Sequence, residues 1–246
     1  MFVPTTLHHQ SCKTECKAFL PDSFSVLCWN VHKNNKNVHF IDYLEKQIKH
    51  KKIDLLLFQE ACFNNDTAFM IPNLAFDAAA NLEINRNFYG VLTASKINAS
   101  YAKAFLSEGK ELFIGPHKSM LLSSYLFKDG SKVLVLNVHA INFRENGRYN
   151  RELVRLFDFI ASYENPIIIA GDFNSWNKKR LERLYERVNT LKLKMVSFGV
   201  NSDVKSFRGN DLDFIFYKGL ELLDASVEKA GKYSDHNPLF AKFKKI

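Results

Sequence analysis

The chain has 246 residues, enough for one large domain or two small ones. Hydrophobic residues make up 46% and charged residues 24%, which excludes disordered and fibrous classes. The net charge of +8 favours polyanionic partners such as nucleic acid, anionic membrane surfaces or highly phosphorylated small molecules, without choosing among them. No apolar stretch approaches the roughly 20 residues of a membrane span, and the N-terminus lacks the apolar core of a signal peptide. We therefore expect a cytoplasmic protein, with export by a signal-less route left open.

Residues 1–22 are polar and weakly periodic, and they predict an N-terminal extension to a single domain over residues 23–246. Cys12 and Cys16 in this extension fit either free thiols on a loose arm or half of a metal site. No second cysteine pair completes such a site, so free thiols are favoured. Cys28 lies in an apolar strand and is expected in the core.

The domain is predicted to be α/β (α+β), with two mixed sheets packed face to face and helices outside. The predicted strands are 24–31, 53–60, 74–80, 88–96, 119–127, 132–140, 166–172, 212–217 and 237–243. Asp129-Gly130 predicts a hairpin between the fifth and sixth of these strands. Apolar residues at helical spacing predict helices over 40–48, 149–160 and 181–188. No element is predicted between residues 97 and 118.

Polar residues with metal-binding capacity lie at the ends of these apolar strands, where a carboxylate is costly to desolvate unless it binds a metal or a partner. The residues are Asn30, Glu60, His139, Asn142, Asp172, Asn174, Asp213, Asp235 and His236. An oxygen-rich set of this kind is typical of Mg²⁺ or Mn²⁺, whereas structural zinc favours cysteine and histidine. With no nucleophilic Ser or Cys motif, the set suggests hydrolysis at phosphorus by an activated water.

Each of these residues also has a purely structural interpretation. Asp172 could close an Asx turn, Glu60 could be an exposed strand end, and His139 could be a hydrogen-bonded core histidine. Their joint occurrence favours catalysis. Four other histidines lie outside these strand-end clusters and are expected on the surface or in the core. They are His32, His39, His50 and His117.

Taken together, the motifs resemble the endonuclease/exonuclease/phosphatase superfamily. They are WN at 29–30, QE at 59–60, NVHAIN at 137–142, GDFN at 171–174, LDFIF at 212–216 and SDHNPL at 234–239. The phrases NVHAINF, AGDFN-x-W and GKYSDHNPL further resemble its bacterial YafD-like subfamily. The resemblance covers roughly residues 23–246 and implies a four-layered α/β/β/α sandwich of the DNase I type with a Mg²⁺-dependent phosphoesterase activity.

The resemblance also implies a role for each motif residue. Metal binding is expected of Glu60 and Asp235, and Asn30 is expected at the same metal site, where it orients nearby groups. Asp172 matches the aspartate that positions or deprotonates the attacking water, and Asn174 matches the asparagine that contacts the scissile phosphate. His236 is expected to contact the phosphate or to act as acid or base, oriented by Asp213. His139 occupies the position of the second histidine of DNase I and the sphingomyelinases. Whether one or two metals act stays open.

Nucleic acid is the leading substrate expectation, because of the basic charge and His139. The alternative is a phospholipid or a phosphorylated small molecule. Asn142, Lys178 and Arg180 are the expected substrate contacts, although a solvated face remains the default for the helix that carries Lys178 and Arg180. The first motif continues as VHKNNKN, without the glycine and arginine of abasic-site enzymes, which weakens a repair interpretation. We expect a monomer.

Overall fold

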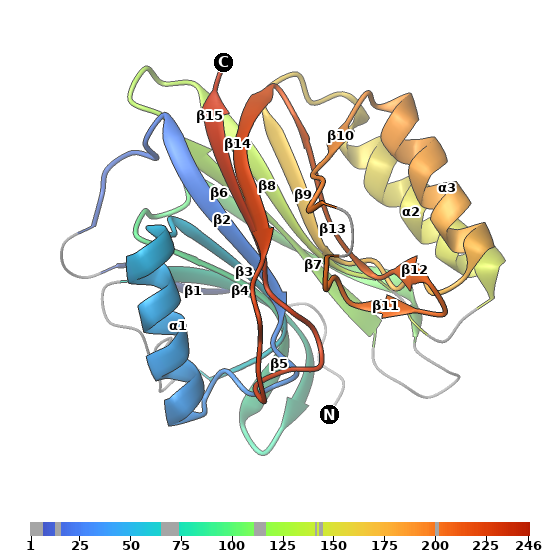
Figure 1. The fold of residues 1–246 in the computed structure, drawn as a ribbon, viewed down its shortest axis with the longest axis horizontal. Coiled ribbons are helices and arrows are strands. Elements are labelled where there is room, and N and C mark those ends of the chain that lie inside the picture. The colour runs from blue at the N-terminus through green and yellow to red at the C-terminus, as the bar shows by residue number, and fades with distance from the viewer. Residues whose placement is uncertain are drawn as a thin grey trace.

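The computed structural model describes residues 7–12, 16–64, 74–110, 117–140, 142, 145–199 and 202–246, with the side chains of 108–110 outside this description. Within these residues two mixed β-sheets pack face to face, with helices on their outer faces (Figure 1). This is the four-layered α/β/β/α sandwich that the sequence predicts. No helix in the described part of the chain has the length and apolar character that crossing a bilayer requires.

The first sheet has seven strands in the order β1-β4-β5-β3-β2-β15-β14. Its strands are β1 (Leu7–Gln10), β2 (Ser23–Asn30), β3 (Leu55–Phe63), β4 (Ala75–Ile84), β5 (Asn87–Ser95), β14 (Leu220–Val227) and β15 (Leu239–Lys245). Only β2 and β3 pair in parallel; the other pairs are antiparallel. Helix α1 (Val38–Lys51) covers the outer face and buries Phe40, Leu44 and Ile48 against it.

The second sheet has six strands in the order β10-β13-β9-β8-β7-β6. Its strands are β6 (Tyr101–Lys110), β7 (His117–Leu126), β8 (Lys132–His139), β9 (Ile167–Asp172), β10 (Lys194–Met195) and β13 (Asp213–Lys218). A separate small hairpin joins β11 (Ser206–Phe207) to β12 (Asn210–Asp211). Helices α2 (Asn146–Ala161) and α3 (Lys178–Thr190) cover the outer face of the second sheet (Figure 1).

The core between the sheets is mainly apolar and contains one buried amide pair. Gln59 Nε2 donates to Asn137 Oδ1 across the interface at 2.7 Å, and Asn137 Nδ2 donates to the carbonyl of Phe58 at 3.1 Å. Both side chains are fully buried. Because unpaired amides in a core are costly, this pair stabilises the packed sheets, and it lies directly behind the strand ends that carry the polar motifs.

Three parts of the predicted fold are corrected. The segment after residue 97 and the segment at 220–227, for which no element is predicted, form the edge strands β6 on β7 and β14 on β15. In the N-terminal segment, β1 pairs with β4, and Cys12 and Cys16 form a disulfide. The interpretation of this segment as a loose arm with free thiols is therefore wrong for its described residues, because β-pairing to a distant strand leaves little local signal. The division of the chain at residue 22 stays a prediction.

Candidate active site

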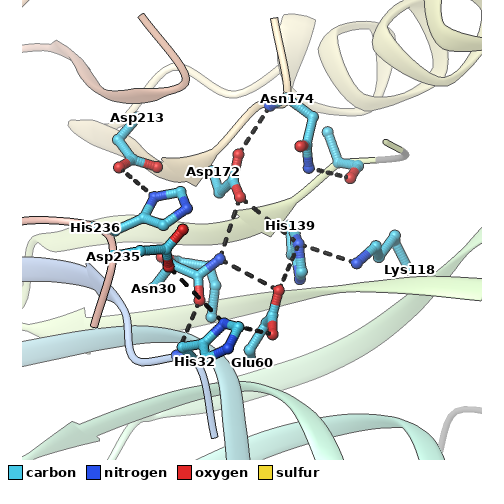
Figure 2. Close-up of polar contacts among 12 residues, drawn as sticks. Asn30, His32, Glu60, Lys118, His139, Asp172, Asn174, Asp213, Asp235 and His236 are labelled. Atoms are coloured by element: carbon cyan, nitrogen blue, oxygen red, sulfur yellow. Dashed lines mark hydrogen bonds and ion pairs between the residues drawn. The ribbon is translucent and has the colours of Figure 1, made fainter. Parts of the chain in front are cut away.

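The polar strand ends meet at one edge of the sandwich. The parallel pairing of β2 with β3 ends there at Asn30 and Gln59, directly before Glu60, and parallel strands β8 and β9 end there with His139 and Asp172. Antiparallel β13 begins at the same edge with Asp213, which pairs in register with Asp172. Strand direction thus brings residues from distant parts of the chain to one place, as Figure 2 shows.

The turn after β9 explains the Gly-Asp-Phe-Asn motif. Gly171 has φ 149°, and a Cβ atom there would lie 1.9 Å from the carbonyl oxygen of Val138 on the neighbouring strand, so only glycine fits. One carboxylate oxygen of Asp172 accepts from the backbone amide of Asn174 at 2.9 Å. The Asx-turn interpretation is therefore correct for that oxygen, and the other oxygen, Oδ2, remains directed at the site.

Asn30 links the two sheets at the site. Its Nδ2 atom lies 3.2 Å from Asp172 Oδ2 and 3.5 Å from Glu60 Oε1, while its Oδ1 accepts from the backbone amide of His32. Asn30 thus presents donors, not an oxygen ligand, to the two carboxylates, and this arrangement supports an orienting role. Glu60 has φ 52° at an irregularity in the pairing of β3, which turns its side chain into the site.

Asp213 and His236 form a buried pair, with Asp213 Oδ2 2.7 Å from His236 Nδ1. Burial lowers the pKa of His236, but the charge and hydrogen bond of Asp213 outweigh burial and raise this pKa to about 9. The imidazole is therefore protonated at neutral pH. Its Nδ1 is bonded to Asp213, so its Nε2 is the nitrogen that can donate a hydrogen bond within the site. Burial and the charge of Asp213 raise the pKa of Asp172, which suits that carboxylate to accept a proton.

His139 is held by a lysine that the sequence did not indicate. Lys118, at the start of β7, places Nζ 3.1 Å from His139 Nε2, and both side chains are buried. Burial and then the charge of Lys118 lower the pKa of His139 well below its ordinary value. His139 is thus a neutral acceptor, and Lys118 brings a positive charge next to Asp172, which lies 3.7 Å from His139 Nε2.

A third histidine, His32, is exposed as the sequence predicts, but it lies beside two carboxylates of the site. Its Nδ1 atom lies 3.8 Å from Glu60 Oε2 and 3.8 Å from Asp235 Oδ1. Asp235 in turn pairs with Lys205 at 2.9 Å. His32 stands two residues beyond the end of β2, and only its closeness in sequence to Asn30 could have marked it.

The three predicted substrate-contacting residues have different positions. Lys178 is exposed at the start of α3, and Asn142 is half-buried beside Trp176, whose Nε1 donates to its carbonyl oxygen at 3.3 Å. Arg180 is fully buried, with its guanidinium 4.3 Å from the ring of Tyr149. It donates to the carbonyl of Asn174 at 3.0 Å. The prediction that Arg180 contacts substrate is therefore wrong, because its side chain is not accessible to solvent.

The donor set fits a divalent cation. The carboxylates of Asp172 and Asp213 lie within 4.8 Å of each other and of His236, and Asp213 Oδ1 is buried without a hydrogen-bond partner among the described residues. Two buried carboxylates side by side require nearby positive charge. Oxygen ligands from Glu60 and Asp235 at the open end of the site are of the kind that Mg²⁺ and Mn²⁺ bind.

Known proteins match this chain in sequence. Residues 27–236 match the model of the Endonuclease/Exonuclease/phosphatase family. A UPF0294 protein of Vibrio cholerae is 30% identical over 228 residues, covering 92% of this chain and 79% of the relative.

Solved structures share the fold at low sequence identity. The human Nocturnin catalytic domain with bound sulfate anion superimposes with a TM-score of 0.67 at 15% identity, covering 98% of this chain and 97% of that one. A mannosyl-6-phosphatase of Bacteroides thetaiotaomicron superimposes with a TM-score of 0.62 at 15% identity, covering 89% and 99%.

Proposed function

Because the chain belongs to the endonuclease/exonuclease/phosphatase family, we propose that it is a divalent-metal-dependent phosphodiesterase that cleaves nucleic acid. The observation that carries the proposal is the position of Asn30, whose amide contacts the Glu60 and Asp172 carboxylates from two different sheets. This contact joins a carboxylate able to bind a cation to a carboxylate able to activate water. A phosphoester hydrolase needs both, a few ångströms apart.

The cation, Mg²⁺ or Mn²⁺ held by Glu60 and Asp235, would stabilise negative charge on the phosphoryl oxygens. Asp172 Oδ2, fixed by Asn30, orients a water molecule for attack at phosphorus and accepts its proton. His236 donates a proton or a hydrogen bond to a phosphoryl or leaving oxygen, and Asp213 fixes its ring through Nδ1. Proton transfer of this kind contributes about 10²- to 10⁴-fold.

Two further side chains would bind the phosphate. Asn174 is held at φ 49° with its Nδ2 donating to the carbonyl of Ala140 at 2.9 Å, so its position is defined before the substrate binds. Lys118, paired with His139 at 3.1 Å, adds a buried positive charge near Asp172. Fixed donors and charges at the reacting group are the main means of stabilising a phosphoryl transition state.

Nucleic acid is proposed as the substrate because the net charge is +8 and Lys178 is exposed next to the GDFN turn. The alternative is a phospholipid or phosphorylated small molecule, a class to which the neighbouring mannosyl-6-phosphatase belongs by name. Monomeric state and cytoplasmic location remain predictions. The Cys12–Cys16 disulfide argues against a cytoplasmic location, because disulfides persist mainly in oxidising compartments.

The test is a substrate panel assayed with Mg²⁺, Mn²⁺ or EDTA, comprising supercoiled plasmid, abasic duplex, single-stranded RNA, sphingomyelin, phosphoinositides and sugar phosphates. We expect metal-dependent cleavage of a nucleic acid, reduced about 10²- to 10⁴-fold by Asp172→Asn and His236→Gln. His39→Gln, on the exposed face of α1, is the matched control and should keep full activity. If only lipid or sugar phosphates are hydrolysed, nucleic acid is not the substrate. If no phosphoester is hydrolysed, the proposed phosphoesterase activity is refuted.

A further inference from the structure

We infer that a groove between the first turns of α2 and α3 binds a phosphate of the substrate next to the one that reacts, and that the enzyme therefore favours polynucleotides over single phosphates. The inference rests on the proposed function, since it names the substrate feature that the same active site would select. The groove has a volume of about 220 Å³ and is lined from α2 by Gly147 and Asn150 and from α3 by Lys179 and Arg183. Neither the sequence motifs nor the matched family description points to these four residues.

The groove lies at the same edge of the sandwich as the catalytic side chains. Helices α2 and α3 each follow one of the parallel strands β8 and β9, which end with His139 and Asp172, so both helices begin at that edge (Figure 1). Arg180, buried against the groove, donates to the carbonyl of Asn174 at 3.0 Å. Tyr149, on the α2 side, also lines a small cavity together with His139. A single layer of side chains therefore separates the groove from the reacting centre, where a neighbouring phosphate of a bound strand would lie.

The groove is positively charged. Lys179 and Arg183 are exposed one turn apart on α3, and the described residues that line the groove include no carboxylate. Arg183 Nη1 contacts Glu186 Oε2 at 2.7 Å, but both side chains are about half exposed, and surface pairs of this kind are weak enough for an anion to compete. Guanidinium and ammonium groups bind phosphate through charge-assisted hydrogen bonds, so this lining favours a phosphate as the occupant.

The α2 residues that line the groove include polar atoms without a partner. The hydroxyl of Tyr149 and Oδ1 of Asn150 are buried with no hydrogen-bond partner among the described residues, and Tyr149 is only 1% exposed. Buried polar groups almost always have partners, so a ligand or a water is expected against them. Helix α2 also begins without a side-chain hydrogen bond from its N-cap, Glu145, and Gly147 has no side chain to cover the first-turn amides. Such amides carry partial positive charge and add to the attraction for an anion.

The experiment measures binding of a fluorescein-labelled single-stranded DNA oligonucleotide by fluorescence anisotropy, in EDTA so that no cleavage occurs, at several salt concentrations. The tested variant combines Lys179→Ala with Arg183→Ala. The matched control combines Lys46→Ala with Lys49→Ala, which removes the same charge from exposed positions of α1 on the other sheet. We expect the tested variant to raise the dissociation constant on the order of 10-fold and to reduce the slope of log affinity against log salt by about 0.7, the value for one phosphate of a single strand. The control should leave both quantities nearly unchanged.

Cleavage with Mg²⁺ gives a second readout. In the tested variant the KM for the oligonucleotide should rise with little change in kcat, whereas the KM for bis(p-nitrophenyl) phosphate, which has a single phosphate, should stay the same. The inference is overturned if the oligonucleotide does not bind, if both double variants weaken binding equally, or if KM rises equally for both substrates. Binding that depends on Lys179 and Arg183 without any cleavage refutes the proposed function alone, and cleavage with unchanged binding in the tested variant refutes the phosphate groove alone.

Discussion

The Nδ1 atom of His236 lies 2.7 Å from Oδ2 of Asp213, and both side chains are more than nine-tenths buried. The partners are 23 residues apart in sequence, on β13 and in the loop before β15. The backbone at His236 is fixed separately, because its carbonyl accepts from Trp29 Nε1 at 2.7 Å. The reactive nitrogen of His236 is therefore held by packing as well as by the carboxylate.

This pair makes stability depend on pH in a defined direction. The folded-state pKa of His236 is raised from 6.5 to about 9 by Asp213, against the lowering effect of burial. The resulting stabilisation is complete below pH 6.5 and is lost as pH rises through about 9. It amounts to at most about 3 kcal/mol, at about 1.4 kcal/mol per pKa unit. In EDTA, His236→Gln should therefore have a lower free energy of unfolding than the unaltered chain. This difference should be larger at pH 6 than at pH 10.

Urea unfolding of both proteins between pH 6 and pH 10 measures this difference. His39→Gln provides the baseline, because His39 is exposed. A difference that is constant with pH, or that grows toward pH 10, would contradict the assigned ion pair.

Arg180 should contribute to stability and not to substrate affinity. Its guanidinium lies between Tyr149 and Trp176, at 4.3 and 4.7 Å from their ring centroids, and donates to the carbonyl of Asn174. Arg180→Leu leaves a buried carbonyl without this donor and removes both ring contacts, at a cost of about 3 kcal/mol. Lys178→Ala, at an exposed position on the same helix, should stay within about 0.5 kcal/mol. Equal urea midpoints for the two variants would show that Arg180 is not buried as described.

Gly171→Ala should abolish folding or cost more than about 4 kcal/mol, because the added methyl group would meet the carbonyl oxygen of Val138 at 1.9 Å and the residue has φ 149°. Gly147→Ala is the control. It lies in α2 with its nearest neighbour 3.9 Å away, a flexible arginine atom, and should gain up to about 1 kcal/mol. Thermal unfolding of both variants followed by circular dichroism decides the point. Near-equal melting temperatures would mean that β8 and β9 are farther apart than described.

The thiols should react in a defined order. Cys28 and Cys62 are both buried. Burial also raises the pKa of the Cys28 thiol, which disfavours the reactive thiolate. Ellman's reagent, applied to protein purified without reductant, should detect no rapidly reacting thiol in the native chain, two after unfolding in urea and four after reduction. Four thiols in the unfolded, unreduced chain would show that Cys12 and Cys16 are not joined.

Much of the fold and of the site was predictable, because the relevant signals are local. Apolar runs such as Ile167–Ala170 identify strands without reference to their partners, and the polar residues that follow them, Asp172 and Asn174, identify the chemistry. Strand direction then places those ends together, as the contact between Asn30 and Asp172 demonstrates.

Other features depend on long-range contacts that leave no periodic signal. Pairing of β1 with β4, and of β6 with β7 at the sheet edge, is decided by the partner strand. Lys178 and Arg180 look equivalent on the chain, yet the second is buried because α2 supplies Tyr149 above it.

The sequence by itself determined the kind of chemistry, because residue types at strand ends set which groups are available. Tertiary structure decided which of those groups act together. Lys118 reaches His139 from the neighbouring strand, and His32 turns back between Glu60 and Asp235. Both placements follow from the packing of two sheets and from a left-handed turn, neither of which a pattern of residue types records.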